Sequence, residues 1–361
     1  MPRRILLLIT DLEIGGTPTV VRELATRLHR PPGVHVEVAC LSKWGPVADQ
    51  IRDAGVTVTA FDATRSWQLP RVVGRLRRLV RQHSIDTVFS FLVHANAVAA
   101  IAKPFCQGVR FLQSIQTTQP DPPWHWKLQR AAHRAAEKVV VPSRSVAEVA
   151  QTWSRVPPEK ISVIPNAVDP DEFDQASSPE PSQPFSIGFI GRLDPVKRVP
   201  LLLEALANTD DDDPFTDLYH VEIYGEGPER STIERRAREL GLSGRVTLHG
   251  PVADPKAALK GLHVLALPSM AEGFGLVLIE AMAAGVPVVA ADVPGIRDVV
   301  RHQETGLLVD PTRRRTFRAH LFGAAHVFRE RLVANGLREV RERFSWDVVL
   351  PQYRALLGVP D

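Results

Sequence analysis

Two glutamates in the second half of the chain, Glu272 and Glu280, are separated by seven residues. The glycines in Gly273-Phe274-Gly275 predict a loop, and the apolar residues after them predict a helix that contains Glu280. A carboxylate inside an apolar helix is costly to bury unless it accepts hydrogen bonds, and sugar hydroxyls are suitable donors. The small residues around Glu280 favour this interpretation over two solvated surface glutamates.

Two basic residues, Arg192 and Lys197, follow the predicted strand 185–190 at a turn that enters a helix. A planar guanidinium and a compact ammonium at this place could clamp a diphosphate, together with the backbone amides at the start of the helix. From the residue types alone, a solvated basic loop is an equal alternative.

A pair of glycines, Gly15 and Gly16, follows the first predicted strand, residues 5–9. Glycines let a backbone approach a ligand closely, and the helix after them offers unpaired N–H groups to an anion. The pattern is not GxGxxG, and no acidic residue stands at the ribose position, so a dehydrogenase is poorly supported. A plain strand-to-helix turn remains the alternative.

Short apolar runs alternate with helical patterns, which predicts βα units and open parallel sheets with helices on both faces. The rhythm stops near residue 165, in a stretch rich in proline and serine, and then restarts. The predicted strands are 5–9, 34–40, 56–61, 86–91, 109–112, 138–141, 185–190, 219–224, 246–249, 263–267 and 286–291. The predicted helices include 18–28, 68–83, 199–208 and 229–240.

This layout predicts an α/β protein of two doubly wound, Rossmann-like domains that face each other across a cleft. We place an N-terminal domain at 1–165, a linker at 166–184 and a C-terminal domain at 185–343. We expect residues 344–361 to form a helix that packs back on the N-terminal domain. The acidic run 210–213 predicts a solvated loop.

Composition agrees with two ordinary globular domains, since the 361 residues are 44% hydrophobic and 24% charged. The segment 1–165 has 22 Lys and Arg against 12 Asp and Glu, whereas the remainder has 22 against 29. The basic half favours phosphate-bearing ligands or an anionic membrane surface. The two cysteines, Cys40 and Cys106, exclude a disulfide scaffold and predict buried thiols in a reducing compartment.

Several motifs resemble, in order, the GT4 family of retaining glycosyltransferases. In chain order they begin with Ile-Pro-Asn at 164–166, Gly-Arg-Leu at 191–193 with Lys197, and Tyr-Gly-Glu-Gly-Pro at 224–228. The two glutamates follow, with Gly-Phe-Gly between them and Ala-Met-Ala-Ala-Gly-Val-Pro-Val after them. The last motif is Gly-Leu-Leu-Val-Asp at 306–310. The resemblance covers essentially the whole chain. It implies the GT-B fold, with the sugar nucleotide held mainly by the second domain.

The resemblance also implies roles for individual residues. Arg192 and Lys197 would bind the diphosphate, Glu280 the ribose hydroxyls, and Glu272 with the Phe274-Gly275 backbone the donor sugar. The residues assigned to substrate binding are Gly15, Gly16, Arg192, Lys197, Gly225, Gly250, Glu272, Gly273, Phe274, Gly275, Leu276 and Glu280. Those assigned to catalysis are His94, Arg192, Lys197 and Glu272.

In the first domain, Gly16 would approach the β-phosphate, and His94 would face the reacting carbon or the acceptor. A histidine at a strand end with a purely structural role is the alternative for His94. The backbone of His249-Gly250 would contact the nucleobase. Three positions depart from the family pattern: Ala167 stands where glycine is common, Gln116 where many members have histidine, and Asp298 where glutamate is frequent.

The resemblance implies a hexosyltransferase without metal or other cofactor, which moves a sugar from a nucleotide sugar to a lipid-linked or cell-surface glycan. A UDP-hexose or UDP-N-acetylhexosamine is the favoured donor, with GDP-mannose as the alternative, and lipopolysaccharide or polysaccharide synthesis is the implied role. A GT-B epimerase or hydrolase and a non-catalytic sugar-nucleotide-binding protein are the rival functions. A nucleic-acid partner is not expected, since no recognised module is present.

The acceptor is expected at a membrane. Residues 70–81 carry five arginines among aliphatic residues at helical spacing, and 124–130 add aromatic and basic side chains. Such helices bind anionic interfaces, although a solvated outer helix is the alternative. We expect no leader and no membrane-spanning run, because the apolar segment 5–9 is too short for either. The expected location is therefore cytoplasmic, with peripheral attachment to the inner face of the membrane.

Overall fold

The computed structural model describes residues 3–30, 33–173, 185–207 and 219–359. Internal contacts divide the chain into an N-terminal unit, formed by 1–166 with 349–361, and a C-terminal unit, formed by 167–348. Residues 174–184 of the predicted linker and the acidic run 210–213 lie outside the described residues.

The N-terminal unit is built on a sheet of seven parallel strands in the order β3-β2-β1-β4-β5-β6-β7. The strands are β1 (Arg3–Ile9), β2 (Val34–Cys40), β3 (Thr57–Ala60), β4 (Thr87–Phe91), β5 (Arg110–Ser114), β6 (Lys138–Val141) and β7 (Ile161–Val163). Six of them coincide closely with predicted strands. The seventh, at the edge, is three residues long and its apolar run is too short for the sequence pattern to mark it.

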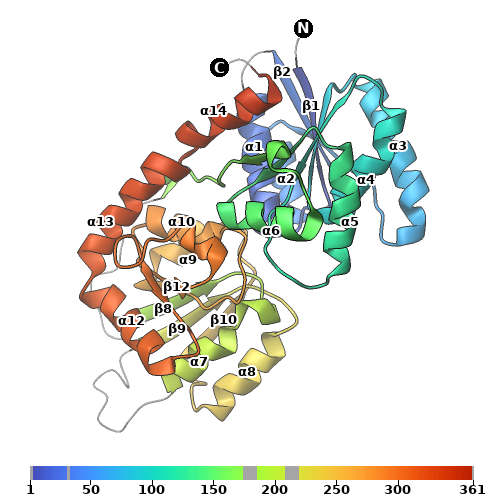
Figure 1. Ribbon diagram of the computed structural model, residues 1–361. Coiled ribbons are helices and arrows are strands. Elements are labelled where there is room, and N and C mark those ends of the chain that lie inside the picture. Colours follow the sequence, from blue (N-terminus) through green and yellow to red (C-terminus); the bar gives the residue numbers. More distant parts are fainter. Residues whose placement is uncertain (1–2, 31–32, 174–184, 208–218, 360–361) are drawn as a thin grey trace. The chain divides into compact units, whose positions relative to one another are not determined.

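Helices cover both faces of this sheet (Figure 1). They are α1 (Gly16–His29), α2 (Pro46–Asp53), α3 (Leu69–Gln82), α4 (Val93–Ala102), α5 (Trp124–Ala132) and α6 (Arg144–Ser154), with short 3₁₀ turns at Ser66–Gln68, Lys103–Phe105, His133–Ala135 and Pro158–Lys160. α1 packs beside α2, whereas α4 packs beside both α3 and α5. Because helices shield both faces, all side chains from Ile5 to Ile9 in the central strand are buried.

Both cysteines, Cys40 and Cys106, are buried and free, as predicted. Burial, with Asp62 and Asp11 as smaller causes, raises the pKa of the Cys40 thiol to about 12. The thiol is therefore protonated at neutral pH, which agrees with a packing role.

The C-terminal unit is built on six parallel strands in the order β10-β9-β8-β11-β12-β13. The strands are β8 (Phe185–Ile190), β9 (Tyr219–Tyr224), β10 (Val246–Gly250), β11 (Val264–Leu267), β12 (Val288–Ala291) and β13 (Leu307–Val309). Its helices are α7 (Val199–Ala207), α8 (Arg230–Glu239), α9 (Pro255–Lys260), α10 (Leu276–Ala283), α11 (Pro294–Arg297), α12 (Arg314–His326) and α13 (Arg329–Glu339), with 3₁₀ turns at Pro170–Glu172 and Pro195–Lys197.

The chain ends with a π-helical turn, Val340–Phe344, and helix α14 (Trp346–Leu357). From residue 349 onward the chain belongs to the N-terminal unit, where Tyr353 is fully buried with its ring 6.3 Å from that of Phe89. The guanidinium of Arg110 on β5 donates to the carbonyls of Leu356 and Leu357. The last helical turn is thereby fixed to the sheet of that unit.

Both sheets follow the same winding, in which the first strand of each unit lies between the second and the fourth. This is the strand order of Rossmann folds, and the predicted fold class of two doubly wound, Rossmann-like domains is confirmed. In such sheets, ligands bind at the carboxyl edge where the strand order reverses, which is between β1 and β4 and between β8 and β11. No helix in the described part of the chain is long and apolar enough to cross a membrane.

Candidate functional site

Several predicted site residues of the C-terminal unit flank its reversal point. Arg192 and Lys197 follow β8, and the segment 269–275 follows β11, so both loops leave neighbouring strands at the carboxyl edge. The amide of Met270 donates to the carbonyl of Val196 at 2.7 Å and joins the two loops. The topology therefore brings together residues that are about 75 positions apart in the sequence.

Lys197 and Glu272 form an ion pair across this reversal point. The Lys197 ammonium donates to Oε1 of Glu272 at 2.6 Å, and the hydroxyl of Ser269 donates to the same oxygen at 2.7 Å. Both charged side chains are largely buried, with 19% and 10% of their surfaces exposed. Two donors on one oxygen fix the Glu272 carboxylate and keep it close to a cation, in a setting where charge interactions are stronger than in water.

Arg192 does not join this pair. Its guanidinium contacts Oδ2 of Asp194 through Nε, at 2.6 Å, and Nη2, at 2.5 Å, while 73% of its side chain is exposed. Asp194 carries no role in the sequence interpretation. Asp194 lies only two residues after Arg192 in the sequence, and this spacing was the feature from which an ion pair between them could have been predicted.

Glycines allow the neighbouring loops to approach one another closely. A Cβ atom on Gly225 would lie 1.9 Å from the carbonyl oxygen of Gly191, and one on Gly227 would lie 2.6 Å from that of Leu193. Hydrogen bonds run from the Gly191 amide to the carbonyl of Tyr224 and from the Leu193 amide to that of Glu226. The loops after β8 and β9 are thus packed backbone against backbone, which only glycine permits at Gly225 and Gly227.

The Gly273–Gly275 loop is followed by α10, as predicted. Gly275 caps the helix in the left-handed conformation, with φ at 79°, and Leu276 is the first helical residue. Glu280 lies in the second turn and only 8% of it is exposed, so both predicted glutamates are buried. Phe274 is also buried, with its ring 5.5 Å from that of Phe344, so its side chain serves packing.

Tyr224 and His249 form a stacked pair at the ends of β9 and β10. The ring centroids are 4.3 Å apart with an interplanar angle of 8°. Nε2 of His249 also pairs with Glu222, and the Gly250 carbonyl accepts from the Gly225 amide at 2.6 Å. Burial and, to a smaller extent, Glu222 raise the pKa of the Tyr224 phenol, so this ring is uncharged at neutral pH.

In the N-terminal unit, the predicted residues also flank the reversal point. Gly15 and Gly16 follow β1, and Gly16 opens α1 with nothing within 4 Å of a Cβ placed on it. His94 is exposed and is the second residue of α4, the helix that follows β4. Leu92, which caps α4, has φ at 70°, a strained conformation for a leucine that redirects the chain at this edge.

Gln116, which departs from the family pattern, contacts the Pro-Asn motif. The amide group of Asn166 donates to Oε1 of Gln116 at 3.3 Å, and Nε2 of Gln116 donates to the hydroxyl of Ser114 at 2.7 Å. The Gln116 side-chain amide thus donates one hydrogen bond and accepts another, and it links β5 to the Pro-Asn motif.

Comparisons with known proteins agree with the motifs. The family profile described as "Glycosyltransferase Family 4" matches residues 14–172, and the one described as "Glycosyl transferases group 1" matches residues 170–321. A D-inositol 3-phosphate glycosyltransferase of Rhodococcus erythropolis is 30% identical over 95% of this chain and 87% of its own length. The chain belongs to glycosyltransferase family 4.

Two further similarities are informative. The GDP-mannose-dependent alpha-(1-6)-phosphatidylinositol monomannoside mannosyltransferase of Mycobacterium tuberculosis is 29% identical, over 85% of each chain. The crystal structure of Anabaena HepE in complex with UDP and glucose superimposes with a TM-score of 0.85 at 20% identity, over 98% of this chain and 99% of that one. Against several other curated relatives, the match spans about half of their length.

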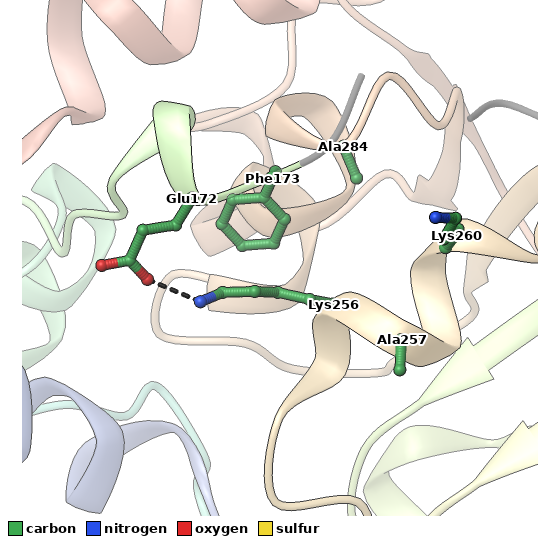
Figure 2. Close-up of a pocket in the computed structure, with 6 residues that line it drawn as sticks. All are labelled: Glu172, Phe173, Lys256, Ala257, Lys260 and Ala284. Carbon is green, nitrogen blue, oxygen red and sulfur yellow. Dashed lines mark hydrogen bonds and ion pairs between the residues drawn. The ribbon is translucent and has the colours of Figure 1, made fainter. Parts of the chain in front are cut away.

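A pocket of about 150 Å³ in the C-terminal unit is lined by none of the predicted site residues. Glu172, Phe173, Lys256, Ala257, Lys260 and Ala284 line it (Figure 2). The Lys256 ammonium pairs with Glu172 at 2.6 Å and lies 5.7 Å from the centre of the Phe173 ring. Sites for drug-sized ligands have volumes of roughly 300–1,000 Å³, so this pocket is too small for a nucleotide sugar.

The aromatic stretch 124–130 is less exposed than its predicted role as a membrane contact requires. Trp126 is buried and its indole N–H donates to the carbonyl of Gln119 at 2.9 Å, so it holds a loop and is not an anchor. Trp124 is half exposed. On α3, Arg75 donates to the carbonyls of Ala60 and Phe61, which leaves four of the five predicted arginines facing outward.

Proposed function

We propose that this protein transfers a sugar, with retention of anomeric configuration, from a nucleotide sugar to a lipid-linked or cell-surface glycan. The observation that carries the proposal is the Lys197–Glu272 pair at the reversal point of the C-terminal sheet. A buried cation beside a buried carboxylate offers one group to a phosphate and the other to sugar hydroxyls. Glu280, buried on the next helix, supplies a second carboxylate for hydroxyl groups.

In this proposal the bond between the anomeric carbon and the β-phosphate oxygen breaks while the diphosphate gains negative charge. Lys197 and Arg192 stabilise that charge in place of a divalent ion. The acceptor hydroxyl attacks from the face that the diphosphate leaves, and its proton passes to the departing phosphate oxygen. No enzyme nucleophile and no cofactor are required.

The donor is proposed to be a UDP-hexose or UDP-N-acetylhexosamine. The stacked rings of Tyr224 and His249 lie at the edge where the nucleobase is expected. The similarity to the GDP-mannose-dependent mannosyltransferase of Mycobacterium tuberculosis supports the alternative donor. Both donor classes therefore belong in the test.

A peripheral position on the inner face of a cytoplasmic membrane, where synthesis of a lipopolysaccharide or polysaccharide takes place, is proposed from α3. Its apolar side packs into the core, while Arg71, Arg77, Arg78 and Arg81 are exposed. Within the described part of the chain, these four arginines make no ion pair. Trp67 and Leu69, 70% and 37% exposed, precede the helix, and an exposed indole beside unpaired cations suits an anionic interface.

The test is turnover of UDP-glucose, UDP-N-acetylglucosamine and GDP-mannose in the presence of EDTA, with extracted membrane lipids as acceptors. The expected result is release of free nucleotide and a glycosylated lipid whose anomeric configuration equals that of the donor. An epimerase would interconvert the sugar without nucleotide release, and a binding protein would consume no donor. Dependence on added metal would contradict the cation-assisted mechanism.

A further inference from the structure

Three aromatic side chains gather at one place in the N-terminal unit. The ring of His94 lies 5.7 Å from that of Trp124 and 5.4 Å from that of His125, and Trp124 and His125 are 4.1 Å apart. All three contacts are edge-on, with interplanar angles between 61° and 86°. Trp124 is 50% exposed, so the cluster presents indole surface beside two imidazoles.

The cluster lies where ligands of this fold are expected. His94 is the second residue of α4, which follows β4, and Trp124 and His125 begin α5, which follows β5. Both helices start at the carboxyl edge of the sheet, and β4 flanks the reversal point of the strand order.

A buried amide network holds the two helices in place. Asn96 on α4 donates to Oε1 of Gln129 on α5 and to the carbonyl of Ser114 on β5, each at 2.9 Å. It accepts from the hydroxyl of Ser90 on β4 at 2.8 Å, and Gln129 donates to Gln113 at 3.0 Å. Because this network joins α4, α5 and both strands, the two helices that carry the three rings are held in place before any ligand arrives.

The chemistry of the cluster matches a sugar ring. Burial, with His94 as the smaller cause, lowers the pKa of His125, which favours a neutral imidazole that donates through one nitrogen and accepts through the other. A pyranose has apolar C–H groups on its faces and hydroxyls around its edge. An exposed indole provides the flat apolar surface, and the adjacent imidazoles provide partners for the hydroxyls.

We propose that His94, Trp124 and His125 form a subsite that binds a pyranose unit of the acceptor. Trp124 and His125 thereby join His94 as residues that select the acceptor. The assignment of this sugar to the acceptor rests on the proposed glycosyl transfer, whereas binding of a pyranose to the cluster does not.

The test is a titration of the whole protein, labelled in its histidine rings, with methyl α-D-mannopyranoside and methyl β-D-glucopyranoside, followed by NMR. The expected result is saturable binding of at least one glycoside, with shifts of the His94 and His125 signals. Trp124→Ala should weaken this binding about tenfold or more, because the aromatic contact with the sugar ring is lost. A tenfold change corresponds to about 1.4 kcal/mol of binding free energy. His125→Ala provides a second variant and should also weaken it.

The control is Phe105→Ala, which removes a phenyl ring of 55% exposure from the 3₁₀ turn Lys103–Phe105, beyond the other end of α4. It should leave glycoside binding unchanged. Binding that is absent in the wild type for both glycosides, or equally strong in Trp124→Ala, overturns the subsite. The subsite is also overturned if Trp124→Ala impairs only the binding of phosphatidylglycerol vesicles, which would make Trp124 a membrane contact.

Donor turnover without acceptor separates this proposal from the proposed function. If the wild type binds a glycoside through Trp124 but consumes no donor, the glycosyltransferase function fails and the sugar subsite stands.

Discussion

Lys197 and Glu272 come from the loops that follow β8 and β11, the two strands between which the order of the C-terminal sheet reverses, and their charged groups lie 2.6 Å apart. The hydroxyl of Ser269 donates to the same carboxylate oxygen. A residue proposed to bind phosphate and a residue proposed to bind sugar are therefore coupled directly. Substitution of one should alter the position of the other.

Lys197→Ala should reduce transfer about 100-fold or more, because a cation that stabilises the developing charge of the diphosphate is lost. The fold should survive, since Ser269 still donates to Glu272 and the rest of the loop is held by backbone hydrogen bonds. Nucleotide release and circular dichroism measure the two outcomes. Lys260→Ala, which removes an exposed lysine from the same unit, is the matched control, and full activity of Lys197→Ala would refute the phosphate role.

Gly225→Ala should destabilise the C-terminal unit by about 2 kcal/mol or more and abolish nucleotide binding. The added methyl would lie 1.9 Å from the carbonyl oxygen of Gly191, and φ at Gly225 is +153°. Gly244→Ala is the control, because nothing lies within 4 Å of a Cβ at that position. Urea unfolding compares the two variants, and equal free energies of unfolding would contradict the close loop packing.

Asn96→Ala should lower the free energy of unfolding by about 2 kcal/mol, because its partners on β4, β5 and α5 are left buried without their hydrogen bonds. The pairwise distances of 2.8–2.9 Å indicate that all of these bonds are formed. Gln82→Ala, which changes an exposed amide at the end of α3, should have little effect. If both variants unfold at the same denaturant concentration, the network does not fix the helices.

Replacing both Arg77 and Arg78 by alanine should weaken binding to vesicles that contain phosphatidylglycerol. At about 1 kcal/mol per basic residue, the expected loss is roughly 30-fold at low salt. Replacing Arg235 and Arg238 on α8 removes the same charge from the other unit and should change binding little. Vesicle binding that is insensitive to salt and to both double variants would rule out the electrostatic contact.

Most of the strands could be predicted from the sequence, because parallel strands buried on both faces are continuous apolar runs such as residues 5–9 and 185–190. The positions of Lys197, Glu272 and Glu280 could be predicted from motifs. Their partners could not, because the Ser269 hydroxyl and the Asp194 carboxylate are common residue types in loops. Only the folded sheet shows which of these polar groups face one another.

The cluster of His94, Trp124 and His125 also escaped the sequence interpretation. The residues stand in two segments about 30 positions apart, and the Trp124–Arg130 stretch resembled an interfacial helix. Burial of Trp126 was not predictable, because an alternation of aromatic and basic residues fits both a membrane surface and a helix packed on one side. In the folded protein, α5 packs against α4 and α6, and these contacts determine which side of α5 faces the core.

The most direct test of the donor site is thermal unfolding of the protein with UDP, GDP and their sugar conjugates in EDTA. A ligand at about 100 times its dissociation constant should stabilise the wild type by about 2.7 kcal/mol. We expect this shift with one nucleotide class and its loss in both Lys197→Ala and Glu280→Ala. No shift with any nucleotide, or a shift that persists in both variants, would contradict a donor site at this reversal point.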